Sequence, residues 1–91
     1  MVNLNLYAWV VGGKQRIAIL KAFCRELTPS QLHKLSKQYN DKISMNNASD
    51  VVRSFAKKGI AVCLTPENKI GRIYKLTSDG EEIRNELLRE G

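Results

Sequence analysis

The sequence predicts one mainly helical domain that carries a small β-hairpin. Three observations lead to this fold class. Apolar residues recur at helical spacing over residues 14–26 and 45–58. Two short segments, 60–65 and 72–76, alternate as strands do, and a polar loop joins them. A chain of 91 residues, 43% of them apolar and 26% charged, has the size and composition of a single globular domain, so we assign residues 1–91 to one domain.

The charge balance favours a polyanionic partner. The formal net charge is +6 at pH 7. A basic surface attracts polyanions, of which duplex DNA is the commonest. Charge alone is equally consistent with a protein that its lysines and arginines keep soluble, so the partner has to be argued from particular residues.

Cysteine usage and hydropathy predict a cytoplasmic protein. Cys24 and Cys63 are the only cysteines, and both stand in apolar stretches without a metal-binding spacing. We expect buried free thiols in a reducing cytosol. Residues 1–11 lack the basic start of a signal peptide, and no apolar run approaches the roughly 20 residues of a membrane span. We therefore expect a protein that contacts no membrane and lies in the cytoplasm or on the nucleoid within it.

Residues 2–11 fit two structures. Their apolar residues alternate as in a strand, yet some also share one helical face. That face would consist of Leu6, Trp9 and Val10. Gly12-Gly13 then break the chain. Tyr7 or Trp9 is exposed unless something covers it, and we weigh packing on the chain's own core equally with a homodimer contact.

Residues 14–26 predict the first well-defined helix. Its apolar face consists of Ile17, Leu20, Cys24 and Leu27. Its basic residues are Lys14, Arg16, Lys21 and Arg25. We expect most of them to form a solvated face, whereas Lys14 and Arg16 lie near the helix start, where they could meet a phosphate.

The next helix has a clear start signal. Thr28 is the expected cap, Pro29 takes the first helical position, and Gln31 completes a capping box. The inner face would contain Leu32 and Leu35, with Tyr39 as a further candidate. The single histidine, His33, has no partner of the kind that holds a metal. Asn40-Asp41 predict a turn.

A helix over residues 45–58 follows. We expect Ile43 to plug the preceding turn, Ser44 to cap the helix, and Gly59 to end it. The inner face would consist of Ala48, Val52 and Phe55, with Val51 or Ala56 at its edge. The outer face would consist of Asn46, Asn47, Ser49, Asp50, Arg53, Ser54 and Lys57.

The hairpin and a last helix complete the chain. The strands 60–65 and 72–76 are joined by the loop 66–71, which is too long for a two-residue turn. Ser78 and Glu81 match a capping box for the last helix. Its apolar stripe would consist of Ile83, Leu87 and Leu88.

This order of elements is compatible with a winged helix-turn-helix: a three-helix core, a two-stranded wing and a C-terminal helix. Ile43-Ser44, followed by a helix that ends Lys57-Lys58-Gly59-Ile60, resembles the recognition helix of MarR-like and ArsR-like regulators. Gly71-Arg72-Ile73-Tyr74-Lys75-Leu76-Thr77-Ser78-Asp79-Gly80 looks like the end of their wing and the entry to their final helix. Two further stretches are similar to small archaeal winged-helix proteins: their opening resembles residues 9–20, from Trp9 to Leu20, and their wing resembles residues 63–72, from Cys63 to Arg72.

The resemblance covers nearly the whole chain and implies a DNA-binding transcriptional regulator. In such families the helix corresponding to 45–58 enters the major groove, and the wing, here 60–76, lies along the adjacent backbone or minor groove. Two features depart from the pattern. Asp50 stands where such helices often carry a neutral or basic residue, and the turn at Asn40-Asp41 lacks the glycine often found there.

We assign the contacts of a DNA complex residue by residue. Asn46 and Asn47 are the candidates for adenine contacts, although either amide could instead satisfy the helix cap. Arg53 suits guanine or a phosphate. Asp50 could accept from a cytosine amino group or pair with a neighbouring cation. The remaining candidates are expected at phosphates or beside the wing, and they are Ser44, Ser49, Lys57, Lys69 and Arg72.

Two functions compete on the sequence alone. The first is a homodimeric, sequence-specific regulator that binds double-stranded DNA, with no cofactor and no effector that the sequence reveals. The second is a winged-helix interaction module that scaffolds proteins and does not touch DNA. The basic balance and the polar face of residues 45–58 favour the first, whereas an exposed apolar patch over that helix would favour the second. Enzyme chemistry has no supporting motif.

Overall fold

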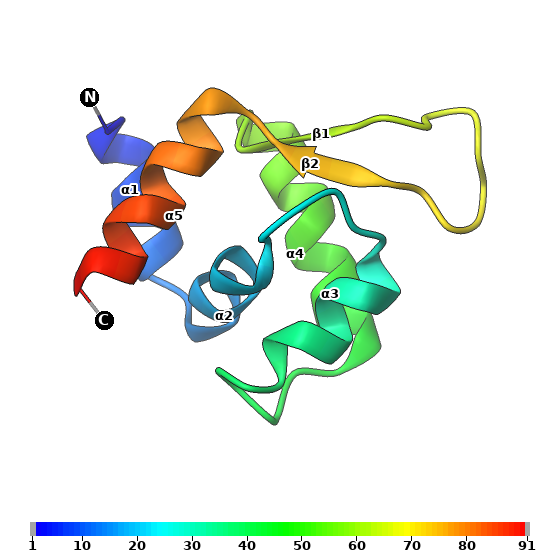
Figure 1. Ribbon diagram of the computed structural model, residues 1–91, viewed down its shortest axis with the longest axis horizontal. Coiled ribbons are helices and arrows are strands. Elements are labelled where there is room, and N and C mark those ends of the chain that lie inside the picture. The colour runs from blue at the N-terminus through cyan, green and yellow to red at the C-terminus, as the bar shows by residue number, and fades with distance from the viewer. Residues whose placement is uncertain (1, 91) are drawn as a thin grey trace.

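The computed structural model describes residues 2–90, with the side chain of Glu90 left out. Five helices and one two-stranded antiparallel sheet follow one another within that range. They are α1 (Leu4–Val11), α2 (Lys14–Ala22), α3 (Pro29–Ser36), α4 (Met45–Lys58), β1 (Ala61–Cys63), β2 (Tyr74–Leu76) and α5 (Ser78–Glu90). The β1–β2 hairpin projects from the body, and α1 and α5 lie at the opposite end, as Figure 1 shows.

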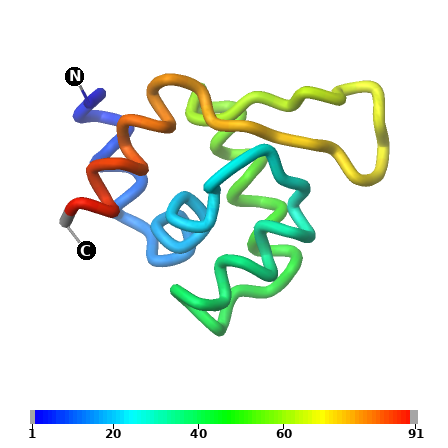
Figure 2. Tube along the Cα trace, viewed as in Figure 1, coloured from blue at the N-terminus to red at the C-terminus, as the bar shows by residue number. Residues whose placement is uncertain are grey.

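The core lies where α2, α3 and α4 meet, and α1 and α5 cover it from the far end. Its largest fully buried side chains come from all of these elements and their connections: Val10, Ile19, Leu20, Phe23, Leu27, Leu32, Val52, Phe55, Ile60 and Ile83. The Cα trace in Figure 2 shows how both chain ends gather away from the hairpin. The predicted architecture, a helical core with a wing and a last helix, is therefore confirmed.

Within residues 2–11, Leu4–Val11 form a helix, α1, and not a strand. Asn3 caps α1, because its side-chain oxygen accepts a hydrogen bond from the Leu6 backbone N–H at 3.1 Å. Val10 is fully buried, and Trp9 packs partly against the core. Of the two readings of Trp9, packing on the chain's own core is the one the structure shows.

The first well-defined helix is shorter than predicted. We expected residues 14–26, but α2 ends at Ala22, and Phe23 already leaves the helical conformation with ψ of 63°. Leu27 instead pairs with Tyr74 in an isolated antiparallel bridge, with N–O distances of 3.0 and 2.9 Å. Cys24 lies in the bend between α2 and this bridge and is exposed, so the prediction that it is buried was wrong. Cys63 is half-buried, and both thiols are free.

The capping box of α3 is present as predicted. The Gln31 N–H donates to Thr28 Oγ1 at 3.2 Å, and the Thr28 N–H donates to Gln31 Oε1 at 3.0 Å. Tyr39 is 45% exposed, so it does not belong to the inner face, because α3 ends at Ser36 and the chain turns before Tyr39. The turn is as expected: the Lys42 N–H donates to Asn40 Oδ1 at 3.1 Å.

The wing is a short ladder with a long tip. Ala61 pairs with Leu76, Val62 with Lys75, and Cys63 with Tyr74. The strands are shorter than the predicted 60–65 and 72–76, although the Leu64 N–H still donates to the Ile73 carbonyl at 2.8 Å. Ala61, Tyr74 and Leu76 face the core, whereas Val62 and Lys75 face outwards.

The start of α5 is shifted by one residue from the prediction. Thr77, and not Ser78, caps the helix: its Oγ1 accepts from the Gly80 N–H at 3.2 Å and donates to the Gly59 carbonyl at 2.6 Å. Gly80 lies so close to the backbone just before β1 that a Cβ there would stand 2.1 Å from the Ile60 oxygen. The apolar stripe consists of Ile83 and Leu87 only, because Leu88 points outwards and is 40% exposed.

Candidate nucleic-acid interface

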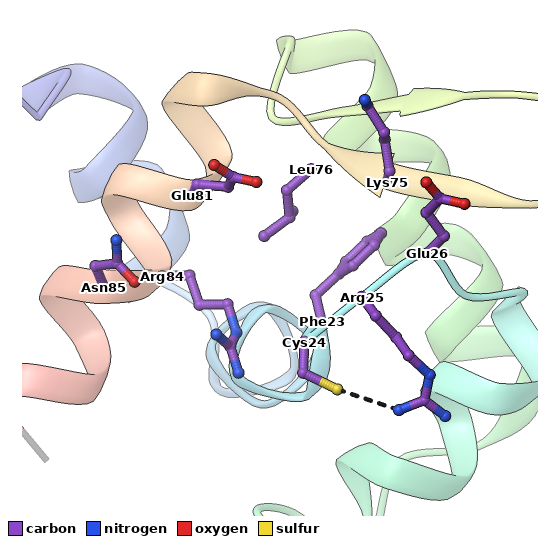
Figure 3. Close-up of a pocket in the computed structure, with 9 residues that line it drawn as sticks. All are labelled: Phe23, Cys24, Arg25, Glu26, Lys75, Leu76, Glu81, Arg84 and Asn85. Atoms are coloured by element: carbon purple, nitrogen blue, oxygen red, sulfur yellow. Dashed lines mark hydrogen bonds between the residues drawn. The ribbon is translucent and has the colours of Figure 1, made fainter.

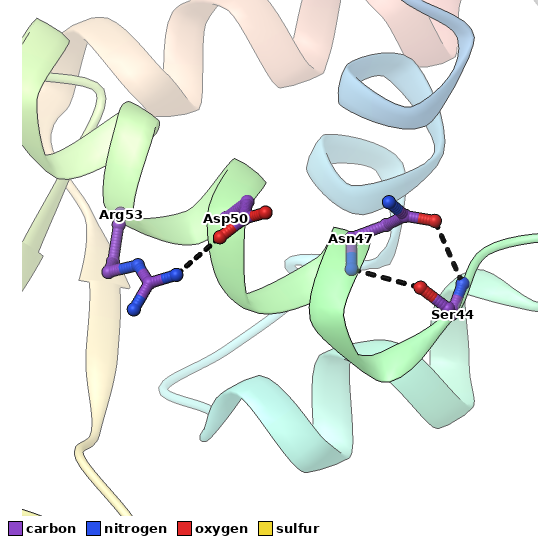
Figure 4. Close-up of polar contacts among 4 residues, drawn as sticks. All are labelled: Ser44, Asn47, Asp50 and Arg53. Atoms are coloured by element: carbon purple, nitrogen blue, oxygen red, sulfur yellow. Dashed lines mark hydrogen bonds and ion pairs between the residues drawn. The ribbon is translucent and has the colours of Figure 1, made fainter.

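The candidate interface is built on α4, which begins and ends as the sequence predicts. Ser44 Oγ accepts from the Asn47 N–H at 3.1 Å, and Asn47 Oδ1 accepts from the Ser44 N–H at 3.3 Å, as drawn in Figure 4. Gly59 ends the helix in the left-handed conformation, with φ of 81°, which glycine adopts without steric cost. Ile43 is buried beneath the turn, and His33 Nε2 lies 2.9 Å from its carbonyl oxygen.

One face of α4 is buried and the opposite face is open. The buried side chains are Ala48, Val51, Val52 and Phe55. The exposed side chains include Asn46, Asp50, Arg53 and Lys57, which recur every three or four residues and so form one stripe. Ser49 and Ser54 are half-buried at its edges. The polar side chains that we assigned to DNA therefore stay accessible along the whole length of the helix.

Asp50 and Arg53 form an ion pair on this stripe. The Arg53 guanidinium donates to Asp50 Oδ1, and Figure 4 shows the two side chains pointing towards each other. Both side chains are well exposed, 63% for Arg53 and 66% for Asp50, so the pair stabilises the helix little. The pairing is one of the two roles we weighed for Asp50, and it occupies part of the donor set of Arg53.

The wing tip carries the other assigned cations. Lys69 and Arg72 are exposed. Arg72 Nε donates to the Asn68 carbonyl at 2.5 Å, which braces the tip. Thr65 Oγ1 accepts from the Ile73 N–H at 3.0 Å and closes the loop from inside. These bonds hold a charged tip away from the protein body, on the side of the molecule where α3 and α4 lie (Figure 1).

Two grooves beside α4 are lined mainly by residues that sequence reasoning did not assign to the site, with Asp50 as the exception. A groove of about 390 Å³ separates α4 from the start of α2 and is lined by Gln15, Ser54 and Asp50, among others. A larger groove between α2 and the α3–α4 turn is lined by Lys21, Lys37 and Lys42, among others. Residues far apart in the sequence meet here, so no local spacing could have indicated the clusters.

A further pocket lies away from this face. It has a volume of about 630 Å³ between the 23–26 segment, β2 and α5, and Figure 3 shows Cys24, Arg25 and Arg84 among its lining residues. The Arg25 guanidinium donates to Cys24 Sγ at 3.6 Å. The Arg84 guanidinium donates to the Lys21 carbonyl at 3.1 and 3.3 Å and so caps the end of α2. The only histidine of the sequence lies elsewhere, and these lining residues make no nucleophile–base pair.

The part of the chain that the structure describes contains neither a metal-binding cluster nor a membrane-spanning helix. Within residues 2–90, His, Cys, Asp and Glu form no group of three or more that could hold a metal ion. None of the helices found over the same residues is long and apolar enough to cross a bilayer.

The core of α2, α3 and α4, with the β1–β2 wing and the flanking helices, defines a winged-helix domain. A solved structure of the type III plasmid segregation protein TubR shares this fold. It superimposes with a TM-score of 0.73 at 18% sequence identity, over 99% of this chain and 88% of TubR. Neither the protein-family models nor the curated proteins gave a match. The likeness shows the fold, and the resemblance to MarR-like and ArsR-like regulators stays a prediction.

Proposed function

We propose that this protein binds double-stranded DNA in a sequence-specific manner and acts as a transcriptional regulator. α4 would enter the major groove, and the wing would lie on the adjacent backbone or in the minor groove. The observation that carries the proposal is the exposed stripe Asn46, Asp50, Arg53 and Lys57 on α4, the helix that leads directly into the wing. The proposal assigns the protein no catalytic step and no cofactor.

The exposed face of α4 supports DNA over a protein partner. Among the large apolar side chains of α4, only Met45 is exposed, at 39%, and it lies at the very start of the helix. A protein-binding helix would present a contiguous apolar patch, with aromatic or aliphatic anchors. α4 presents amides, hydroxyls and charges, which are the groups that read base edges and phosphates.

A second candidate is DNA segregation, because the structural neighbour is a plasmid segregation protein. A plasmid is double-stranded DNA, so both functions use the same face of α4 and differ in where the sites lie. A regulator would occupy sites close to promoters, whereas a segregation protein would occupy sites on the DNA whose inheritance it secures, irrespective of promoters. Mapping the occupied sites in the native genome distinguishes the two.

We also propose a homodimer that forms through α1. The helix carries no charged residue, and its outer face exposes Leu4, Ala8 and Val11 at i, i+4 and i+7. Leu4 is 77% exposed. α1 and α5 lie at the end of the molecule away from the wing (Figure 1), and Leu88 of α5 is also exposed. Contact there would leave the α4 face of both copies open for DNA, and a DNA-bound dimer would reside in the cytoplasm with the nucleoid.

Selection of bound sequences from random duplex DNA tests the function directly. The proposal predicts enrichment of one motif, with two half-sites if the protein is a dimer. The enriched duplex should bind more weakly as salt rises, with a linear relation between log affinity and log salt. Absence of any duplex binding at low salt would reject the proposal. Solution mass measured for the wild type and for Leu4→Glu tests the dimer, and only the variant should be monomeric.

A further inference from the structure

A cationic groove lies between α2 and the turn that joins α3 to α4. Its volume is about 790 Å³, and its lining includes four lysines, Lys14, Lys21, Lys37 and Lys42, together with one carboxylate, Asp41. We call this feature the lysine groove. Within residues 2–90, none of the four amines forms an ion pair with a carboxylate at 4.0 Å or less. Four positive charges are therefore gathered with only one nearby negative group, an arrangement that favours an anionic partner.

The lysine groove is continuous with the exposed face of α4. Lys14 and Gln15 line it, and the same two residues line the smaller groove whose other wall is formed by Asp50, Val51 and Ser54 of α4. A ligand that lies along the α4 stripe therefore reaches the lysines without leaving the surface.

The lysine groove and the wing lie at opposite ends of α4. The α3–α4 turn leads into the first residue of α4, whereas β1 follows Gly59 at the helix end, and Figure 1 shows the turn and the hairpin on either side of the helix. α4 has 14 residues and is therefore about 21 Å long. The major groove of B-DNA is about 12 Å wide. Where a helix of this length crosses the major groove, it overhangs the groove, and each end lies close to one of the two bordering backbones.

From this geometry we propose that the lysine groove holds the phosphodiester backbone of the strand opposite to the one that the wing contacts. The inference rests on the proposed function of α4 as the duplex-binding helix and deepens it. The two basic features would clamp one duplex from the two edges of its major groove. The wing contributes Lys69 and Arg72 to this clamp, and the lysine groove contributes its four amines.

A single strand is the other polyanion that a basic groove with an aromatic side chain can bind, because bases stack on exposed rings. Tyr39 is the aromatic residue of the lysine groove, but Lys21 Nζ already lies 5.8 Å from the centre of its ring. A stacked base would have to displace that amine. The duplex backbone needs no such change, so the observations favour it.

The test compares two variants that lose the same charge. Lys37→Ala/Lys42→Ala removes two exposed amines from the lysine groove. Arg25→Ala/Arg89→Ala removes two exposed cations that lie outside α4, the wing and the lysine groove, and serves as the control. Affinity for the selected duplex is measured between 50 and 200 mM salt. Each phosphate contact that is lost lowers the slope of log affinity against log salt by about 0.9, so the groove variant should lose about 1–2 units and the control none.

Each outcome has a distinct meaning. Equal slopes for the groove variant and the control, with wild-type binding intact, would overturn this inference and leave the proposed function standing. The inference would also be overturned if the groove variant lost binding to a single strand of the same sequence while its salt slope for the duplex stayed unchanged. Failure of the wild type to bind any duplex would remove the proposed function and this inference together. Lys69→Ala/Arg72→Ala is the positive control, because it removes the two cations of the wing and should therefore lower the salt slope for the duplex.

Discussion

The ring of Trp9 meets the ring of Phe55 edge-on, with centroids 5.9 Å apart and planes inclined by 70°. Two cations cover the same indole: the Arg16 guanidinium lies 4.3 Å from its centre and Lys58 Nζ lies 5.3 Å from it. Arg16 also donates to the Trp9 carbonyl at 2.6 Å. One side chain thus joins α1, the start of α2 and the end of α4. The helix proposed for dimer contact is fixed to the helix proposed for DNA.

Trp9→Ala is expected to destabilise the fold by about 2–4 kcal/mol, below the upper range for a fully buried aromatic because the indole is only half-buried. The variant loses the contact with Phe55 and both cation–ring contacts. Trp9→Phe keeps a ring and should lose less than half as much. Both variants lose the only tryptophan of the chain, so tryptophan fluorescence cannot follow their unfolding. Urea unfolding is therefore followed by circular dichroism. Equal losses for the two variants would contradict a role for the ring.

Gly80→Ala is expected to destabilise by about 2–4 kcal/mol, or to prevent folding, because its Cβ would stand 2.1 Å from the Ile60 oxygen and 3.1 Å from Leu76 Cδ2. Neither the Gly59–Ile60 backbone nor α5 can move away without breaking the hydrogen bonds that Thr77 makes to the carbonyls of Gly59 and Ile60. Gly12→Ala is the control: its Cβ would find neighbours at 3.4 Å or more, so its effect should be within about 1 kcal/mol. Thermal unfolding of the two variants gives the comparison, and similar midpoints would disprove the close approach.

The elements whose ends depend on local chemistry were predicted well. α4 runs from Met45 to Lys58, as expected, because Ser44 and Gly59 supply a cap and a stop within the sequence itself. α2 was predicted too long, since its end depends on the pairing of Leu27 with Tyr74, which lies 47 residues further on (74 − 27). Helix propensity continued past Ala22, and a contact between distant residues overrode it.

The cap of α5 is another case in which a contact between distant residues overrides a local sequence pattern, here by a single residue. Ser78 and Glu81 match a capping box by spacing, yet Thr77 is the cap. Thr77 gains a second hydrogen bond to the Gly59 carbonyl, and this bond exists only in the folded wing. A pattern in the sequence offers both residues as caps, and the tertiary contact decides between them.

Thr77→Ala is therefore expected to cost about 1–2 kcal/mol, through loss of the α5 cap and of the bond to Gly59. Ser78→Ala should change stability by less than about 0.5 kcal/mol, because Ser78 is exposed and alanine suits a first turn. Chemical denaturation of both variants gives the answer. A larger loss of stability for Ser78→Ala than for Thr77→Ala would show that Ser78 caps α5, as the sequence predicts.

Asp50→Asn is expected to tighten binding to every duplex by about two- to tenfold at low salt, because it removes a carboxylate from the face of α4 and releases Arg53 from its ion pair. Fold stability should change by less than about 0.5 kcal/mol, since the pair is exposed and screened by solvent. Affinities for several duplexes, measured in parallel, test the effect. Weaker binding confined to sites with one particular cytosine would instead show that Asp50 reads that base.

The candidate site, like the fold, has a part that local sequence patterns predict and a part that depends on contacts between distant residues. The stripe on α4 follows from helical periodicity, so its members could be named in advance. The lysine groove could not, because Lys14 and Lys42 meet only once α2 packs beside the α3–α4 turn. The structure also distinguishes the roles of the two asparagines. Asn47 Oδ1 accepts from the Ser44 N–H, whereas Asn46 is exposed and has no side-chain hydrogen bond among residues 2–90.

Asn46→Ala should relax the preference for one base pair by about 1–3 kcal/mol and leave other positions unchanged, because a bidentate adenine contact needs both the oxygen and the amide nitrogen. Asn47→Ala should instead destabilise the fold by about 0.5–2 kcal/mol through the capping box and weaken all duplexes alike, since its oxygen already accepts from Ser44. Binding to a panel of single-base variants, combined with unfolding curves, separates base reading from capping. A base-specific defect in Asn47→Ala with unchanged stability would reverse the two assignments, because the cap would then have to open when α4 enters the groove.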